Sequence, residues 1–219
     1  MEGTVRIGIL GTGVVGQTIG GRLVELGHEV KLGSRTSTNE KAAKWVGQHG
    51  PRASQGTFAE AASFGEMVFN CTSGTVSLDA LQSAGSANLD GKVLVDVANP
   101  LDFSHGMPPT LSVSNSDSLG EQIQRTFPKA KVVKALNTMN TGVMVNPSSV
   151  PGDHDAFICG NDAGAKSQVI EVLRSFGWRT IVDLGDITGA RGAEMLLPIW
   201  LRLMGTLKTA TFNFHIARS

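Results

Sequence analysis

The N-terminal part of the chain contains three glycines with the spacing of a phosphate-binding turn: Gly11, Gly13 and Gly16. An apolar, β-branched run precedes them, and a helical pattern follows them as far as Leu26. Glycine at the first position permits a tight turn, at the second lets the backbone approach a pyrophosphate, and at the third lets the helix pack closely on its strand. The residues therefore predict a strand, a turn and a helix that together bind a dinucleotide.

The N-terminus of that helix is expected to hold the anion. The amides of Val14 and Val15 face the turn there, and unpaired N–H groups and the helix dipole both favour negative charge. The alternative is a glycine turn in an α/β protein that binds no nucleotide. We favour the nucleotide because a strand precedes the turn, a helix follows it, and a basic turn lies at the right distance downstream.

This basic turn follows a second expected strand, which should end beside the ribose of the adenosine. From residue 31 to residue 39 the chain has no acidic residue, and it offers Ser34, Arg35 and Thr36 instead. A carboxylate here would bind the 2′-hydroxyl of NAD and repel a 2′-phosphate, whereas a guanidinium with neighbouring hydroxyls binds the phosphate by charge-assisted hydrogen bonds. The turn therefore predicts NADP(H) as the cofactor.

Small polar residues follow three of the later apolar runs, and we expect them beside the rest of the dinucleotide. They are Thr72, Ser73, Asn99, Asn137 and Thr138. In open parallel sheets, ligands lie beyond the carboxyl ends of the strands. The alternative is that these residues only terminate strands; we weigh the two evenly for Ser73 and Asn99, and favour a binding role for Asn137 and Thr138.

The sequence assigns no catalytic side chain. It has no tyrosine, which excludes a Tyr-dependent short-chain reductase. His105 and His154 are the other candidate proton donors, and both are more simply polar loop residues. No histidine has metal-ligand spacing with a cysteine or carboxylate, so no metal site is expected. Cys71 and Cys159 lie in expected buried strands as small apolar residues, which predicts neither a disulfide nor a catalytic thiol.

The elements that must position these residues alternate along the chain. Strands are expected at 5–10, 29–32, 67–72, 93–98, 131–136, 154–159 and 178–184, and helices at 14–26, 38–49, 57–64, 75–84, 118–127, 162–176 and 188–207, the last broken by Pro198. This alternation predicts an α/β fold, a Rossmann-type doubly wound and mostly parallel sheet. We expect an NADP-binding domain over residues 1–185, and a C-terminal helical segment over 186–219 that completes a second pocket or a dimer interface.

Composition narrows the functional classes further. The chain has 219 residues and a formal net charge of zero, so no basic surface favours nucleic acid or an anionic membrane. The longest unbroken apolar run covers only residues 195–201, which is too short to span a bilayer, and no secretory leader is evident. We therefore expect a cytoplasmic protein whose partner is a small molecule or coenzyme.

Three segments together resemble the family of NADPH-dependent coenzyme F420 reductases, whose nucleotide-binding domain recurs in metalloreductases of the STEAP type. The segments are 11–16 with 33–35, Val-Lys-Ala-Leu-Asn-Thr at 133–138, and Pro-Ile-Trp-Leu-Arg-Leu-Met at 198–204 with Phe-Asn-Phe at 212–214. The last segment is more similar to bacterial members of the group than to the archaeal enzymes. The resemblance implies that Thr12, Ser34 and Arg35 contact phosphate groups. It also implies that the Asn137 region lies by the nicotinamide and that the C-terminal segment helps to wall the second pocket.

The resemblance implies hydride transfer between NADP(H) and a deazaflavin such as coenzyme F420, a reaction that needs positioned rings and no obligatory acid or base. A second hypothesis is an NADPH-dependent reductase of a flavin, a metal chelate, an imine or a small carbonyl compound. A third is a non-catalytic module that senses NADP(H). We expect a homodimer, because a short chain without a large substrate domain commonly closes its second pocket with a partner subunit.

Overall fold

The computed structural model describes residues 3–218, and its centre is an eight-stranded sheet. The strands are β1 (Arg6–Leu10), β2 (Glu29–Ser34), β3 (Ala53–Thr57), β4 (Met67–Asn70), β5 (Val93–Asp96), β8 (Lys131–Ala135), β9 (Asp155–Gly160) and β10 (Thr180–Asp183). Their order is β10-β9-β8-β5-β4-β1-β2-β3. Neighbouring strands are parallel except β8 and β9, which are antiparallel. This is the Rossmann-type, mostly parallel sheet that the sequence predicts.

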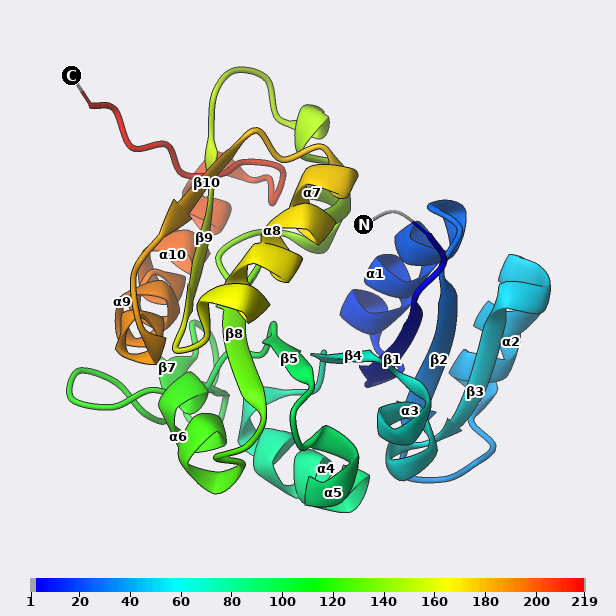
Figure 1. The fold of residues 1–219 in the computed structure, drawn as a ribbon. Coiled ribbons are helices and arrows are strands. Elements are labelled where there is room, and N and C mark those ends of the chain that lie inside the picture. Colours follow the sequence, from blue (N-terminus) through cyan, green and yellow to red (C-terminus); the bar gives the residue numbers. More distant parts are fainter. Residues whose placement is uncertain (1–2, 219) are drawn as a thin grey trace.

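Helices cover both faces of this sheet (Figure 1). They are α1 (Val14–Glu25), α2 (Glu40–His49), α3 (Phe58–Phe64), α4 (Ser77–Ala84), α5 (Ser86–Leu89), α6 (Leu119–Thr126), α7 (Thr141–Val145), α8 (Ala163–Phe176), α9 (Ala190–Met195) and α10 (Leu197–Leu207). A small antiparallel hairpin, β6 (Leu101–Asp102) with β7 (Thr110–Leu111), lies outside the sheet. Helices α1, α2, α7 and α8 pack on one face, and α3 to α6 on the other.

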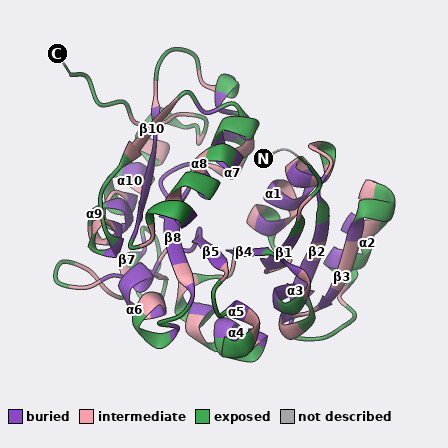
Figure 2. Ribbon diagram, in the orientation of Figure 1, coloured by how far each residue is buried: buried purple, intermediate pink, exposed green. Residues whose placement is uncertain are grey.

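The sheet therefore separates two apolar cores. Ile7 and Ile9 of β1 belong to the core under α1 and α8, whereas Leu10 belongs to the core under α3, α4 and α6. Successive strand side chains point to opposite faces, so strands buried on both sides must be apolar at nearly every position. Figure 2 shows the result, with buried strands between helices whose outer surfaces are exposed.

Local signals set the helix ends. The Asp162 carboxylate accepts a hydrogen bond from the Ala165 amide at 2.7 Å and caps α8, which ends at Gly177 in the left-handed conformation (φ 105°). Both ends are as the sequence predicts. At α6, Ser118 caps the helix as expected, accepting from the Glu121 amide at 3.1 Å. The spacing of Ser118 and Glu121 is that of a capping box, but the Glu121 carboxylate accepts from the Ser118 hydroxyl and from Arg191.

Several elements were not predicted from the sequence. The edge strand β3 has the sequence Ala-Ser-Gln-Gly-Thr, which lacks an apolar run because the strand has one neighbour, β2. The β6–β7 hairpin and the short helices α5 and α7 were also missed. Each has five residues or fewer, too short for a periodic pattern to develop.

The C-terminal segment crosses the far end of the sheet. Helix α9 ends at Met195 and α10 begins at Leu197, so the helical pattern breaks beside Pro198 as predicted. The extended tail is fixed to the start of β9, where the Asp155 amide donates to the Phe214 carbonyl at 2.9 Å and the Asp155 carboxylate accepts from the Ile216 amide. Beyond this point the tail leaves the body of the molecule (Figure 1). Within residues 3–218, no helix combines the length and apolar character needed to cross a membrane.

We predict that Gly8→Ala will destabilise the protein, because an added Cβ would lie 2.2 Å from the Ala61 carbonyl oxygen of α3. The expected loss is about 2 kcal/mol or more in the free energy of unfolding, measured by urea denaturation. The matched control is Gly47→Ala, at an exposed position of α2 with open space around it, which should gain about 0.5–1 kcal/mol. Equal effects of the two substitutions would contradict the packing argument.

Candidate functional site

Two cavities open at the carboxyl ends of the parallel strands. Cavity A, of about 630 Å³, is lined by Gly11, Thr12, Gly33, Ser34, Arg35, Thr36, Asn39, Phe58, Thr72, Val76, Asp79, Ala80 and Ser83. Cavity B, of about 290 Å³, is lined by Val15, Cys71, Thr72, Ser73, Gly74, Val97, Ala98, Asn99, Leu101, Phe103, Asn137, Met139, Asn140, Thr141, Met144, Leu197 and Trp200. Thr72 lines both, so one extended ligand can occupy the two together.

The glycine turn between the cavities has the geometry of an anion cradle. Gly11 has a φ of 120°, and a Cβ there would lie 2.7 Å from the Cys71 carbonyl oxygen. A Cβ at Gly16 would lie 2.3 Å from the Gly11 carbonyl oxygen, which confirms the close packing expected of the third glycine. At Gly13 the space is open, and this residue caps α1 without a side chain. The first-turn amides of α1 are therefore left to a ligand, which fits a pyrophosphate.

The basic turn forms one edge of cavity A. The Ser34 hydroxyl donates to the Thr36 carbonyl at 2.6 Å and accepts from the Thr36 amide at 3.3 Å, which holds the turn closed around Arg35. Arg35 is exposed, and no carboxylate of residues 3–218 pairs with it. Asp79 of α4 lies on the lining of the same cavity. The turn therefore presents one guanidinium without a carboxylate partner, as suits a 2′-phosphate, while the Ser34 and Thr36 hydroxyls donate to the Thr36 and Thr38 carbonyls and hold the turn in shape.

The ends of β5 and β8 are joined by an amide pair at the floor of cavity B. The Asn99 amide donates to the Asn137 carbonyl, and the Asn137 amide donates to the Asn99 side-chain oxygen, both at 2.9 Å. The Asn137 amide also donates to the Ala193 carbonyl of α9 at 3.1 Å. Both N–H groups of Asn137 are thus engaged within the protein, and its amide oxygen remains to accept a hydrogen bond from a ligand.

The structure brings most of the predicted site residues to these cavities. Gly11, Thr12, Ser34, Arg35, Thr36 and Thr72 line cavity A, and Val15, Thr72, Ser73, Asn99 and Asn137 line cavity B. Gly13, Val14, Gly16 and Thr138 line neither. Thr138 is 1% exposed, and its hydroxyl has no partner among the described residues. The glycines and Val14 shape the turn between the cavities, whereas Thr138 lies behind the lining.

Several lining residues were missed by sequence reasoning. On cavity A they include Asn39, Phe58 and Asp79, and on cavity B they include Thr141. Thr141 directly follows the run 137–140 after β8, so extending that signal by one residue would have found it. Asp79 lies on an exposed face of α4, and nothing in the local pattern separates it from a solvated side chain.

The candidate proton donors lie away from both cavities. His105 is exposed in the loop between β6 and β7. The two ring nitrogens of His154 bind the Pro147 carbonyl and the Asn213 amide, each at 3.0 Å. An amide N–H donating to Nδ1 and a carbonyl accepting from Nε2 suit the tautomer that carries its hydrogen on Nε2, and the two contacts tie the tail to the 147–153 loop. Neither histidine is among the residues that line cavity A or cavity B.

The two cysteines behave as apolar residues. Burial raises the pKa of the Cys71 thiol far above its ordinary value, and burial likewise raises the pKa of Cys159 to about 12. The thiolate form that reacts is therefore scarce at neutral pH. Among the residues that the structure describes, no cluster of three His, Cys, Asp or Glu side chains is placed to hold a metal ion.

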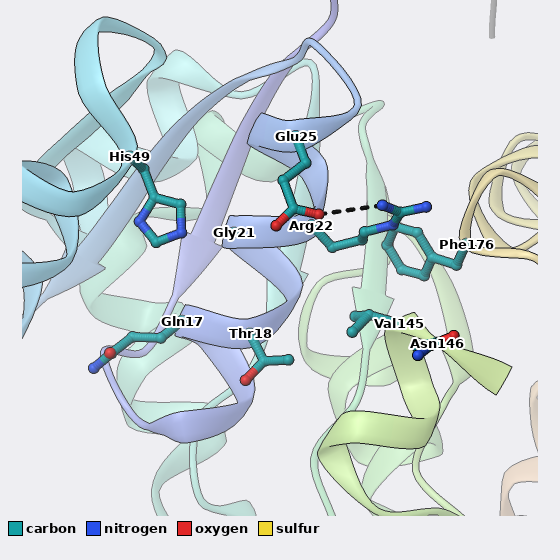
Figure 3. A pocket seen from close by; sticks show the side chains of 9 residues that line it. All are labelled: Gln17, Thr18, Gly21, Arg22, Glu25, His49, Val145, Asn146 and Phe176. Atoms are coloured by element: carbon teal, nitrogen blue, oxygen red, sulfur yellow. Dashed lines mark hydrogen bonds and ion pairs between the residues drawn. The ribbon is translucent and has the colours of Figure 1, made fainter. Parts of the chain in front are cut away.

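A third cavity, of about 520 Å³, lies between α1, the end of α2, the end of α7 and the end of α8 (Figure 3). Its polar residues include Gln17, Arg22, Glu25 and His49, and Arg22 is paired with Glu25 at 3.1 Å. None of its lining residues lines cavity A or cavity B. Gln17 connects it to the glycine turn, because its amide donates to the Thr12 carbonyl at 2.8 Å. We assign this cavity no ligand.

Comparison with known proteins points to one group. The sequence model of the family described as "NADP oxidoreductase coenzyme F420-dependent" matches residues 6–100. A crystal structure from Arthrobacter sp. FB24, described as a candidate F420-dependent NADP reductase, is 54% identical and superposes with a TM-score of 0.93 over 99% of this chain and 100% of its own.

Two curated relatives extend this likeness. The metalloreductase STEAP3 of Rattus norvegicus is 32% identical over 89% of this chain, and the F420-dependent NADP reductase of Methanocaldococcus jannaschii is 30% identical over 52%. The chain spans 38% and 52% of the lengths of these relatives. The imine reductase of Streptomyces aurantiacus, 20% identical with a TM-score of 0.67 over 93% of this chain and 63% of its own, shares the fold alone.

We predict that Arg35→Ala weakens NADPH binding by about 2 kcal/mol or more and leaves NADH binding nearly unchanged, because only NADPH carries the 2′-phosphate. Titration calorimetry with each nucleotide measures the difference. The matched control is Arg174→Ala on the exposed surface of α8, which should alter neither affinity. Equal losses for NADPH and NADH would refute the role given to Arg35.

Proposed function

The chain belongs to the family of F420-dependent NADP oxidoreductases, and on that basis we propose that it transfers a hydride between NADP(H) and a flat deazaflavin such as coenzyme F420. That it is an NADP-dependent oxidoreductase follows from the family. The identity of the acceptor is our proposal. It is supported by the chemistry of cavity B, argued below.

The dinucleotide would be held by groups from three strand ends. The α1 amides at Val14 and Val15 would bind the pyrophosphate, and the Arg35 guanidinium would bind the 2′-phosphate. Bound NADPH supplies a hydride from its reduced nicotinamide ring. The Asn137 amide oxygen would accept from the carboxamide of that ring, since both N–H groups of Asn137 are engaged by Asn99 and Ala193. Such a contact would hold the ring against the wall of cavity B.

One observation carries the choice of acceptor: the lining of cavity B contains no histidine, lysine, arginine, aspartate or glutamate. A carbonyl reductase must protonate a developing alkoxide, for which such a side chain or a tyrosine is normally present. A deazaflavin instead spreads the incoming charge over ring nitrogen and oxygen atoms, where solvent can supply the proton. Positioning alone then accounts for most of the acceleration.

Among the other acceptors, a small carbonyl compound fits this lining poorly. A flavin, an iminium ion or a metal chelate also needs no proton donor at the hydride step, and such acceptors remain alternatives to the deazaflavin. Apolar side chains such as Phe103, Leu197 and Trp200 wall the cavity, and Trp200 is stacked on Phe212 of the tail at 5.3 Å between ring centroids. Broad apolar walls suit a flat conjugated ring system, which favours the deazaflavin or a flavin.

We also propose that residues 1–185 form the NADP-binding domain and that 186–219 close cavity B and a dimer interface. Two contributions support this: α10 supplies Leu197 and Trp200 to the cavity, and the same helix leaves Ile199 and Leu207 about half exposed. Ile216 of the tail is also half exposed. Large apolar side chains gathered on one segment suit a second copy of the chain, which would shield them and the opening of the cavity together.

The acceptor proposal predicts that the purified protein oxidises NADPH with coenzyme F420 as sole acceptor. With NADPH deuterated at the reacting carbon, the label should appear on the central ring of the deazaflavin by mass spectrometry, because the hydride moves directly. Turnover with a carbonyl compound or a flavin, and none with F420, would contradict the proposal.

A histidine substitution separates the reaction classes. His105→Ala should retain the F420 rate, because no side chain acts as an acid in the proposed reaction. If His105 were a proton donor, its loss would lower the rate by about 10²–10⁴-fold. His154→Ala is a poorer test, since it also removes the contacts of His154 with Pro147 and Asn213.

The dimer proposal predicts that sedimentation velocity at micromolar concentration will show twice the mass of the chain. Ile199→Asp with Leu207→Asp should give a monomer, because a buried charge pair of equal sign opposes association. Met107→Asp, at an exposed apolar residue of the β6–β7 loop, is the control and should leave the dimer intact. A wild-type monomer would exclude this interface.

A further inference from the structure

Three ionisable side chains are buried together behind cavity B. Lys134 of β8, Asp96 at the end of β5 and Glu194 of α9 are each at most 1% exposed. The Lys134 ammonium lies 2.7 Å from an Asp96 oxygen and 2.7 Å from a Glu194 oxygen. None of the three lines cavity A or cavity B, so the proposed hydride transfer does not use them directly.

Every hydrogen-bonding group in this buried ion cluster has a partner. Lys134 directs its third N–H to the Ala98 carbonyl at 2.6 Å. Besides Lys134, Asp96 accepts from the Asn70 side chain at 2.9 Å and from the Ala98 amide at 3.2 Å. Burial alone would lower the pKa of Lys134, but Asp96 and Glu194 together raise it above its ordinary value, so the ammonium stays charged.

Glu194 connects elements that are far apart in the sequence. Besides Lys134, its carboxylate accepts from the Leu119 and Gly120 amides at 2.9 and 3.1 Å, at the N-terminus of α6. One side chain of the C-terminal segment is thus bonded to both β8 and α6. A second contact also joins α9 to α6, in which Arg191 donates to the Glu121 carboxylate at 2.9 Å.

The cluster joins three walls of cavity B. Asp96 and Ala98 fix the end of β5, which continues into Asn99 on the lining. Lys134 precedes Asn137 by three residues. Glu194 follows Ala193, the carbonyl that accepts from Asn137, and it precedes the cavity residue Leu197. The cluster is therefore attached to three walls of cavity B, which belong to β5, β8 and α9. Through the Asn70 side chain it also reaches Thr72, which lines both cavities, whereas Glu194 bonds to no described residue of cavity A.

Stability alone is a weak reason for such a cluster. Removing charges from water costs several kcal/mol for each ion, and a well-packed apolar replacement for a buried ion pair is often as stable. What ions provide that apolar side chains do not is direction, since each bond fixes one atom against another. A cluster that spans three elements fixes their relative position.

We propose that the Lys134–Asp96–Glu194 cluster is a positioning device for the nicotinamide half of the dinucleotide. It holds the Asn137 amide oxygen and the α9–α10 wall at a set distance from the end of β5. Loss of one charge should loosen this geometry and weaken contacts to the nicotinamide ring while leaving the adenosine half in place. The inference rests on NADP(H) binding across both cavities and not on the identity of the acceptor.

The test compares NADPH with 2′,5′-ADP, which has the 2′-phosphate and the adenosine but lacks the nicotinamide. Glu194→Gln keeps the shape of the side chain and removes its charge. We expect its affinity for 2′,5′-ADP to stay within about twofold of wild type, and its preference for NADPH over 2′,5′-ADP to fall about tenfold, because one well-placed hydrogen bond to the ring is worth a factor of about this size. Titration calorimetry gives both constants.

A second variant and a control make the result specific. Asp96→Asn breaks the same cluster from the opposite wall and should lower the same preference. Glu66→Gln, which removes a charge from an exposed pair with Arg6, should change neither constant. Thermal unfolding of each variant shows that the comparison is made on folded protein.

Other outcomes of these titrations would contradict either the positioning role of the cluster or NADP(H) binding itself. Parallel losses for NADPH and 2′,5′-ADP in both cluster variants would show a merely structural role and overturn the inference. An unchanged preference in both would overturn it as well. A wild-type chain that binds neither ligand would refute NADP(H) binding itself, and the inference with it.

Discussion

The close approach of backbones around β1 is the constraint on which the site depends. Added Cβ atoms at Gly8, Gly11 and Gly16 would each lie within 2.7 Å of a carbonyl oxygen of the neighbouring backbone. No rotamer change can relieve such a contact, because the obstacle is main chain. The glycines therefore fix α3 against β1, β1 against the end of β4, and α1 against the turn. As a result, the N-terminus of α1 is held at the carboxyl ends of the strands. The turn before this helix and its first residues line the two cavities.

Charge is distributed unevenly between the two cavities. Cavity A presents Arg35 to solvent at one end and Asp79 on α4, whereas the lining of cavity B has no ionisable side chain except the half-buried thiol of Cys71. The charged side chains nearest to cavity B lie behind its wall, where Lys134 pairs with both Asp96 and Glu194. Affinity and selectivity for a phosphorylated nucleotide can therefore be set at one end without placing a proton donor at the other.

The sequence allowed the fold to be predicted because its signals are local. Gly11 and Arg35 belong to short motifs, and the caps Asp162 and Gly177 act within one turn of helix. The buried cluster could not be found in this way, because Asp96, Lys134 and Glu194 are separated by many residues. Among its sequence neighbours, each of the three looks like an ordinary surface charge. Partners at such separations are set by strand order, and a single sequence does not show which distant charges the sheet brings together.

Polar bonds also explain why the C-terminal segment belongs to the site although it is last in the sequence. Helix α10 is rich in apolar residues, yet only Leu197 and Trp200 of it are buried, so its own hydrophobic packing against the domain is limited. Polar contacts add to this packing: Glu194, Arg191 and the Ala193 carbonyl, all on α9, bind the domain, and the tail binds Asp155 of β9. Directional bonds tolerate less displacement than apolar contacts. A wall attached in this way keeps one position against the strand ends, and that constancy is what a reaction governed by ring placement requires.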